Sequence, residues 1–298
     1  MSRLYEALQR ADQERRNAPP PEEFPAVVPV PVSETEELAP AQIQVPLEQI
    51  AHYAWTPSVA SFPTLADRGQ GVEQFRSLRS RIYQARYEAP LKTLLISSGM
   101  PSEGKSFIAA NLAMNLARNT VNNILLIDGD LRRPTLHSLL GAPNTPGLTE
   151  YLESKAELQD ILQRDSTPRS ADPANTGSIA NLTFIPAGKC GDNSSELVAN
   201  HRIQELIEAL SPHFDWILID SPPVLAVTDA VELGRAADAV LLVARGARTP
   251  YDVAQRAQAA FGKSRILGFV LNDVKDIPKR GYNYYDYYRG PSAAIRAK

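Results

Sequence analysis

The sequence predicts an α/β fold in which a mostly parallel sheet carries helices on both faces. Six short apolar runs alternate along the chain with segments of helical periodicity. Most of these runs are apolar at consecutive positions, which is typical of strands covered on both sides in a parallel sheet. The predicted strands are residues 93–98, 123–128, 181–188, 216–221, 239–245 and 266–272.

A helix is predicted before the first of these strands. Apolar side chains recur there at three- and four-residue spacing, which places them on one helical face. They are Val72, Phe75, Leu78, Ile82 and Ala85. The globular domain is therefore expected to span residues 70–274.

Composition separates this domain from three flanking parts. Residues 1–16 form a predicted docking helix that Ser2 can cap. Residues 17–69 are a predicted proline-rich acidic linker, because they hold ten of the 24 prolines. Such a segment buries too little apolar surface to offset its ordering entropy, so we expect disorder. Residues 275–298 form a predicted flexible, tyrosine-rich tail.

The composition also excludes several classes of function. The net charge of −3 gives no electrostatic argument for a nucleic-acid partner. Cys190 is the only cysteine, so we expect neither an intramolecular disulfide nor a zinc cluster. No apolar run approaches the roughly 20 residues of a membrane span, and the first residues lack the apolar core of a signal peptide. We therefore expect a cytoplasmic protein.

A glycine-rich motif carries the strongest chemical signal. Residues 99–106 match G-x-x-x-x-G-K-S between a predicted strand and a predicted helix, the context of a P-loop NTPase. The glycines let backbone N–H groups face an anion, and the helix N-terminus adds a positive dipole end. Lys105 is expected to reach the β- and γ-phosphates, and Ser106 to bind Mg²⁺. The predicted ATP-binding residues here are Gly99, Met100, Pro101, Ser102, Glu103, Gly104, Lys105, Ser106 and Phe107.

Acidic residues end two of the predicted strands, at the sheet edge where parallel sheets bind ligands. Asp220 is interpreted as the Walker B carboxylate, which holds Mg²⁺ through water. Asp128 and Asp130 stand two residues apart, so one can serve the metal while the other accepts a proton. A tyrosine hydroxyl, with a pKa of about 10, benefits from such an acceptor. The alternative is that one of these two carboxylates only caps the segment that follows.

The tail contains a cluster of tyrosines without core periodicity. The cluster consists of Tyr282, Tyr284, Tyr285, Tyr287 and Tyr288. We interpret these tyrosines as phosphoacceptors on an arm long enough to reach a neighbouring subunit. Each added phosphate would carry about −1.5 to −2 charges and so alter assembly. The alternative is a stacking segment or a strand edge.

These motifs together resemble the bacterial tyrosine kinases (BY-kinases) of capsule and exopolysaccharide synthesis. The resemblance rests on the phosphate loop, residues 128–134 (DGDLRRP), residues 220–223 (DSPP) and the tyrosine cluster, and it covers about residues 70–290. It implies an enzyme that uses ATP and Mg²⁺ to phosphorylate its own tail in trans. It also implies catalytic roles for Lys105, Asp128, Asp130 and Asp220, with Asp128 as the general base. The ligands of Mg²⁺ that it implies are Ser106, Asp130 and Asp220.

The resemblance further implies partners. Glu73, Arg76 and Arg79 match the E-x-x-R-x-x-R element with which the family assembles rings, although spacing alone indicates only a solvated helix face. The chain looks like the split type, whose membrane-anchored polysaccharide co-polymerase or adaptor recruits the kinase to the inner face of the membrane. A phosphotyrosine phosphatase is the other implied partner. Residues 189–195 depart from the family's proline-rich turn.

The main alternative is a nucleotide-driven switch of the ParA or MinD type. Such ATPases usually place a second lysine after the first glycine of the phosphate loop, where this chain has Met100. They also lack a clustered tyrosine tail. Asn272, at the end of the last predicted strand, is expected to contact adenine under either hypothesis and does not discriminate.

Overall fold

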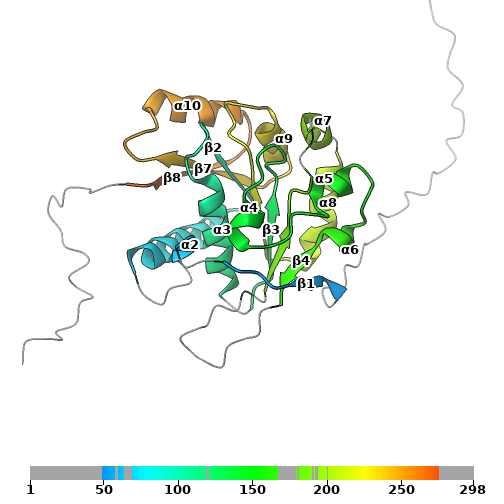
Figure 1. Cartoon of the computed structure of the whole chain (residues 1–298). Helices are drawn as coiled ribbons and strands as arrows, with labels where there is room; N and C mark the ends of the chain where they lie inside the picture. The colour runs from blue at the N-terminus through cyan, green and yellow to red at the C-terminus, as the bar shows by residue number, and fades with distance from the viewer. Residues whose placement is uncertain are drawn as a thin grey trace, which may run out of the picture. The chain divides into compact units, whose positions relative to one another are not determined.

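One mixed sheet organises the protein. The computed structural model describes residues 49–57, 60–63, 69–118, 121–166, 179, 181–189, 191, 194–199 and 201–274. In this part of the chain, eight strands form a sheet in the order β1-β4-β5-β3-β6-β2-β7-β8 (Figure 1). Neighbouring strands are parallel, except that β4 and β5 run antiparallel. The predicted α/β fold with a mostly parallel sheet is confirmed.

The six predicted strands are present. Their bounds are β2 Thr93–Ser98, β3 Ile124–Asp128, β5 Leu182–Ile185, β6 Trp216–Asp220, β7 Ala239–Arg245 and β8 Ile266–Asn272. Every residue of β2, β3, β5 and β6 is buried, as expected for strands covered on both faces. The edge strand β8 differs, because Phe269 and Leu271 are exposed.

The other two strands were not predicted. β1 (Ala51–Tyr53) pairs with β4 (Gln163–Asp165) at the far edge of the sheet. Trp55 and Phe62, which follow β1, are buried in the core. The predicted linker over residues 17–69 is therefore too long at its C-terminal end. The sequence pattern did not indicate that these residues belong to the domain, because they are interrupted by prolines and polar residues and a three-residue edge strand has no apolar run of its own.

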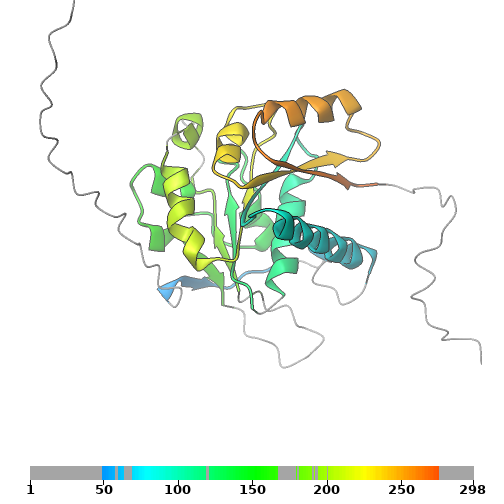
Figure 2. The same ribbon diagram turned by 180° about the vertical axis from the view of Figure 1, so that it is seen from behind.

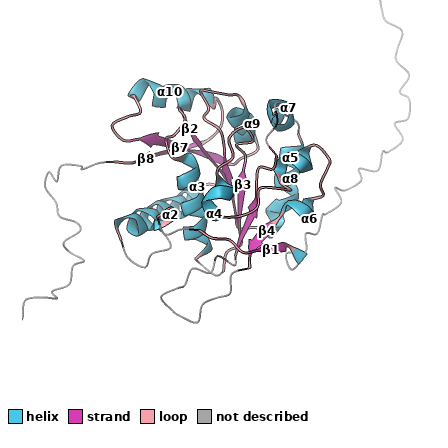
Figure 3. Cartoon of the chain, viewed as in Figure 1, coloured by secondary structure: helices cyan, strands magenta, loops and turns pink. Residues whose placement is uncertain are grey.

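Helices lie on both faces of the sheet (Figures 1 and 2). Two apolar clusters result, because successive strand residues point to opposite faces. Leu94 and Ile96 belong to the cluster that includes α2 and α3, and Leu95 belongs to the cluster that includes α8 to α10. Burying one such side chain contributes roughly 1.5–3 kcal/mol. Figure 3 shows the same layers by secondary structure.

The described helices are short except for two. Their bounds are α2 Gln70–Glu88, α3 Lys105–Ala117, α4 Leu136–Leu140, α5 Leu148–Leu152, α6 Leu158–Ile161, α7 Ser194–Ala199, α8 Arg202–Leu210, α9 Asp229–Arg235 and α10 Tyr251–Ala260, with a 3₁₀ turn at Ser211–His213. The helix predicted from the first apolar stripe is confirmed as α2, whose Val72, Phe75 and Ile82 are buried. In the described part, no helix combines the length and apolar character of a membrane span.

Two predicted segments lie outside the described residues. They are the docking helix of residues 1–16 and the tail of residues 275–298, which includes all five predicted phosphoacceptors: Tyr282, Tyr284, Tyr285, Tyr287 and Tyr288.

Candidate active site

The phosphate loop leads from β2 into α3, so the expected strand–loop–helix arrangement is present. Gly104 caps α3 with a φ of 94°, a left-handed conformation that favours glycine. A Cβ atom at this position would lie 2.0 Å from Nδ2 of Asn272. The second glycine of the motif therefore meets two needs, its own backbone conformation and the close approach of β8.

A buried carboxylate braces the loop. Oε2 of Glu103 accepts a hydrogen bond of 2.8 Å from the backbone N–H of Met100, and Oε1 accepts one from the hydroxyl of Thr249. Glu103 is only 4% exposed. Its side chain thus holds the loop to the segment before α10 rather than facing an anion. Sequence reasoning missed Thr249, because it stands 146 positions from its partner.

The end of β8 braces the same loop. Nδ2 of Asn272 donates to the carbonyl oxygen of Glu103 at 3.0 Å. Arg245, at the end of β7, pairs with Asp273 at 2.7 Å and donates to the carbonyl oxygen of Ser102 at 3.4 Å. Contact of Asn272 with adenine stays a prediction. In this structure its amide supports the phosphate loop.

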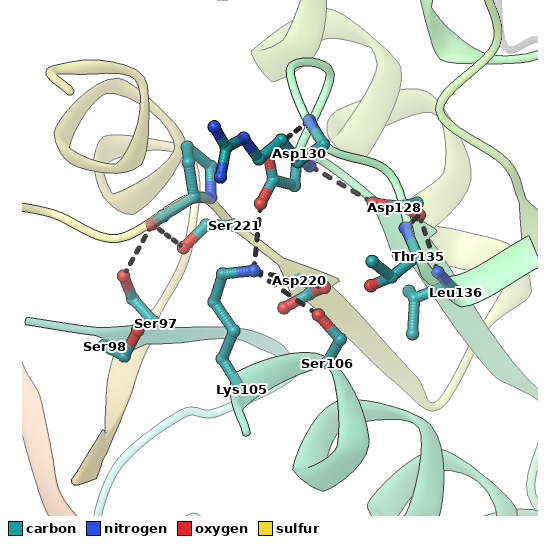
Figure 4. A network of polar contacts seen from close by, with 12 residues as sticks. Ser97, Ser98, Lys105, Ser106, Asp128, Asp130, Thr135, Leu136, Asp220 and Ser221 are labelled. Carbon is teal, nitrogen blue, oxygen red and sulfur yellow. Dashed lines mark hydrogen bonds and ion pairs between the residues drawn. The ribbon is translucent and has the colours of Figure 1, made fainter. Parts of the chain in front are cut away.

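Lys105 gathers the predicted catalytic residues at the carboxyl ends of β3 and β6 (Figure 4). Its Nζ lies 2.9 Å from Oδ2 of Asp130, 4.0 Å from Oδ2 of Asp220 and 3.4 Å from the hydroxyl of Ser106. Burial lowers the pKa of Lys105, but the charges of Asp220 and Asp130 outweigh burial, and that pKa is raised overall. The lysine is therefore held as a cation at the base of the loop.

Asp220 is an open carboxylate. It is fully buried, and within the described part of the chain neither of its oxygens accepts a hydrogen bond of normal geometry; the hydroxyl of Ser106 and the N–H of Ser221 make only weaker contacts with it. Burial raises its pKa to about 6, although the charge of Lys105 opposes the shift. A buried carboxylate without hydrogen bonds of normal geometry, with Ser106 and Asp130 around the same lysine, is a donor set that suits Mg²⁺. The predicted ligands thus fit the ion that the motif implies.

Both carboxylate oxygens of Asp128 accept backbone hydrogen bonds. Its Oδ1 accepts from the N–H of Asp130 at 3.3 Å, and its Oδ2 accepts from the N–H groups of Thr135 and Leu136 at 3.2 and 3.0 Å. Burial and then the charge of Asp220 raise the pKa of Asp128 well above its ordinary value, against the N–H of Leu136. These contacts are those of a carboxylate that caps α4, the alternative that the sequence left open.

A cleft of about 560 Å³ opens beside Lys105. The phosphate loop and Phe107 form one side of it, and residues after β3 and β6 form the other. The far side consists of Asp130, Arg132, Arg133, Thr135, Pro222, Pro223, Ala226 and Val227. Asp130 thus faces the cleft, whereas Asp128 lies behind it. The cleft offers a phosphate cradle, a cation and a carboxylate on one surface.

The predicted oligomer residues lie on α2, outside this cleft. Glu73 and Arg76 pair at 2.5 Å and are exposed. Arg79 donates to the carbonyl oxygen of Asn115 on α3 at 3.0 Å, so this arginine is engaged within the subunit. Assembly through these residues stays a prediction.

Comparisons with known proteins relate the chain to bacterial tyrosine-protein kinases. No family model matches the chain. It is 36% identical over 220 residues to the tyrosine-protein kinase wzc of Salmonella typhimurium, which covers 72% of this chain and 29% of wzc. It is 34% identical over 215 residues to the tyrosine-protein kinase YwqD of Bacillus subtilis, which covers 72% of this chain and 85% of YwqD. The kinase domain of the Escherichia coli tyrosine kinase ETK superimposes with a TM-score of 0.64 and 30% identity, over 83% of this chain and 98% of that one.

Proposed function

Because the chain belongs to the bacterial tyrosine kinase (BY-kinase) family, we propose that it transfers the γ-phosphoryl group of ATP to tyrosines of its own tail. The observation that carries the proposal is the meeting of Lys105, Asp130 and Asp220 beside a complete phosphate loop. The ParA or MinD alternative has less support, because the position of the second lysine holds the half-exposed Met100.

Each residue of the site has a proposed task. The loop N–H groups and Lys105 bind the ATP phosphates and orient the γ-phosphoryl group. When bound, Mg²⁺ supplies positive charge beside the β- and γ-oxygens, and Ser106, Asp130 and Asp220 would hold it. Phe107 lines the cleft and packs against Phe75, with ring centroids 6.1 Å apart.

The proton of the acceptor tyrosine needs a carboxylate. We assign this task to Asp128, whose raised pKa makes it a better proton acceptor than an ordinary carboxylate. Its burial and its three N–H donors oppose the assignment, since the turn after β3 would have to open before a hydroxyl could reach it.

Labelling with ATP tests the kinase activity. Full-length protein with labelled ATP and Mg²⁺ should incorporate phosphotyrosine, and Lys105→Met should lower incorporation by at least about 10²-fold. Changing all five tail tyrosines to phenylalanine should abolish incorporation but preserve ATP hydrolysis. The matched control changes Tyr87 and Tyr251 to phenylalanine, because these exposed tyrosines lie outside the tail. Unchanged labelling of the tail variant would refute the acceptor assignment.

Mixing two variants, neither of which can label itself, tests transfer between subunits. The Lys105→Met chain retains its tail tyrosines but lacks the lysine. The tail variant retains Lys105 but lacks the five tail tyrosines. Labelling of the Lys105→Met chain in the mixture indicates transfer in trans. No labelling in the mixture, with wild-type protein labelled in parallel, indicates transfer within one chain.

The proposed setting is capsule or exopolysaccharide synthesis and export. The family resemblance supports a homo-oligomeric ring built through Glu73, Arg76 and Arg79. It also supports recruitment from the cytoplasm to the inner face of the membrane by an adaptor, and reversal by a phosphotyrosine phosphatase. No nucleic-acid partner is proposed, since the net charge is −3.

A further inference from the structure

The wall of the cleft opposite the phosphate loop has features that binding ATP phosphates does not require. Pro222, Pro223, Ala226 and Val227 present an apolar surface there. A tyrosine ring is mostly apolar with one polar tip, so such a surface suits the ring of an acceptor.

Two arginines border that wall, and they differ in their partners. Nε of Arg132 donates to Oδ2 of the buried Asp229 at 2.9 Å, and the same guanidinium contacts the hydroxyl of Ser195. Ser195 in turn donates to Oδ1 of Asp229 at 2.9 Å. Arg132 thus ties the turn after β3 to α7 and α9, so its charge is balanced within the fold.

Arg133 has a fixed backbone and an available charge. Its N–H donates to Oδ1 of Asp130 at 3.0 Å, while Oδ2 of the same carboxylate contacts Lys105 at 2.9 Å. Its exposed side chain lines the cleft, and its guanidinium has no ion pair with any residue that the structure describes. The carboxylate of Asp130 therefore bridges the backbone N–H of Arg133 and the side chain of Lys105, the lysine proposed to bind phosphate.

We propose that Arg133 forms an anion subsite that selects acceptor tyrosines with a carboxylate or a phosphate monoester one or two residues away. The inference rests on the proposed function. Asp286 stands between Tyr285 and Tyr287, and the other tail tyrosines flank this trio. In an extended chain, Cα atoms lie about 3.8 Å apart in neighbouring residues and roughly 7 Å apart two positions along, so an anion at either position stays within reach of a long arginine side chain beside the acceptor. Phosphorylation of one tyrosine would therefore prime transfer to the next.

Peptides spanning residues 281–290 test the subsite. In all three peptides Tyr287 is the only free tyrosine. The first keeps Asp286 and the second carries Asp286→Asn, both with the other tyrosines changed to phenylalanine. The third carries Asp286→Asn and has phosphotyrosine at Tyr285, with the remaining tyrosines changed to phenylalanine. The kinase is the full chain with its five tail tyrosines changed to phenylalanine. We expect kcat/KM for each anionic peptide to exceed that of the neutral one by about 10- to 100-fold, the range of a charged hydrogen bond.

Variants of Arg133 test whether this residue causes the preference for anionic peptides. In Arg133→Ala the ratio between anionic and neutral peptides should fall to about one, and Arg133→Lys should restore part of it, because it keeps the charge but loses the bidentate geometry. Arg256→Ala is the matched control, since this exposed arginine on α10 pairs with Asp252, outside the cleft. Equal kcat/KM for the three peptides, or a preference that survives Arg133→Ala, overturns the proposal.

The two anionic peptides also separate the sources of charge. A preference only for the phosphorylated peptide makes the subsite a reader of earlier phosphorylation, and a preference for both makes it a reader of acidic context. ATP hydrolysis without transfer to any peptide refutes the proposed kinase function instead. That outcome is distinct from transfer without a preference.

Discussion

The ends of β3 and β6 lie side by side, yet their carboxylates have opposite environments. Asp128 and Asp220 are neighbours in the sheet register, and both are fully buried. Asp128 accepts three backbone hydrogen bonds, whereas Asp220 accepts none in the described part of the chain. The same residue type in paired positions thus caps a turn at the end of one strand and is left without backbone hydrogen bonds of normal geometry at the end of the other.

The segments that follow the two strands explain the difference. After β3 the chain folds back, so the N–H groups of Asp130, Thr135 and Leu136 point at Asp128. After β6 come Pro222 and Pro223, which have no N–H to donate. The N–H of Ser221 is also committed, to the carbonyl oxygen of Ile96 at 3.2 Å. The two prolines therefore help to leave Asp220 without backbone hydrogen bonds of normal geometry.

The largest expected effect is on catalysis at β6. Asp220→Asn should lower kcat by about 10³-fold, because it removes a charge that would hold the metal. It should not lower the free energy of unfolding of the ligand-free protein, because the burial that raises the pKa of Asp220 to about 6 outweighs the attraction of Lys105. Steady-state kinetics and urea denaturation check the two parts. A variant with normal kcat would contradict the assignment of Asp220.

A mixed effect is expected at β3. Asp128→Asn should lower the free energy of unfolding by about 1–3 kcal/mol, since an amide cannot accept all three hydrogen bonds. If Asp128 is also the general base, kcat should fall by about 10²-fold at temperatures well below melting. Denaturation and kinetics on one preparation separate the two effects. Lower stability with unchanged kcat would leave Asp128 a capping residue and remove it as the base.

The smallest expected effect is a difference in pH dependence. The pKa of Asp220 is about 6 in the folded protein and 3.8 ordinarily. A raised folded pKa means that this group's contribution to stability is present below about pH 4 and is lost as the pH rises through 6. The Asp220→Asn variant lacks this loss. Its stability advantage over wild type should therefore grow between about pH 4 and 6, by on the order of 1–3 kcal/mol.

Thermal or urea denaturation across this pH range, without nucleotide and Mg²⁺, measures that advantage. Asp128→Ser provides a comparison at the neighbouring strand end. Parallel stability curves for wild type and Asp220→Asn would show that Asp220 titrates as an ordinary carboxylate, and would contradict the expected effect of its burial.

Most of the sheet could be predicted from sequence, because six of its strands have an apolar run of their own: β2, β3, β5, β6, β7 and β8. β1 and β4 could not, since AHY and QRD are three-residue segments without an apolar run, and their mutual pairing joins residues more than 100 positions apart in the chain. The site followed the same division. Lys105, Ser106 and Asp220 belong to local motifs, whereas the brace from Thr249 to Glu103 depends on residues far apart in sequence.

The sequence alone determined that a phosphate loop joins a strand to a helix, because glycine conformation, helix start and strand hydrophobicity are local properties. The tertiary structure decided what the acidic residues can do. Whether a buried carboxylate accepts backbone hydrogen bonds depends on which N–H groups the fold brings to it, and those groups come from turns later in the chain. The motif therefore predicted a set of three aspartates, and the fold divided them into Asp128, held by its turn, Asp130, facing the cleft, and Asp220, open beside Lys105.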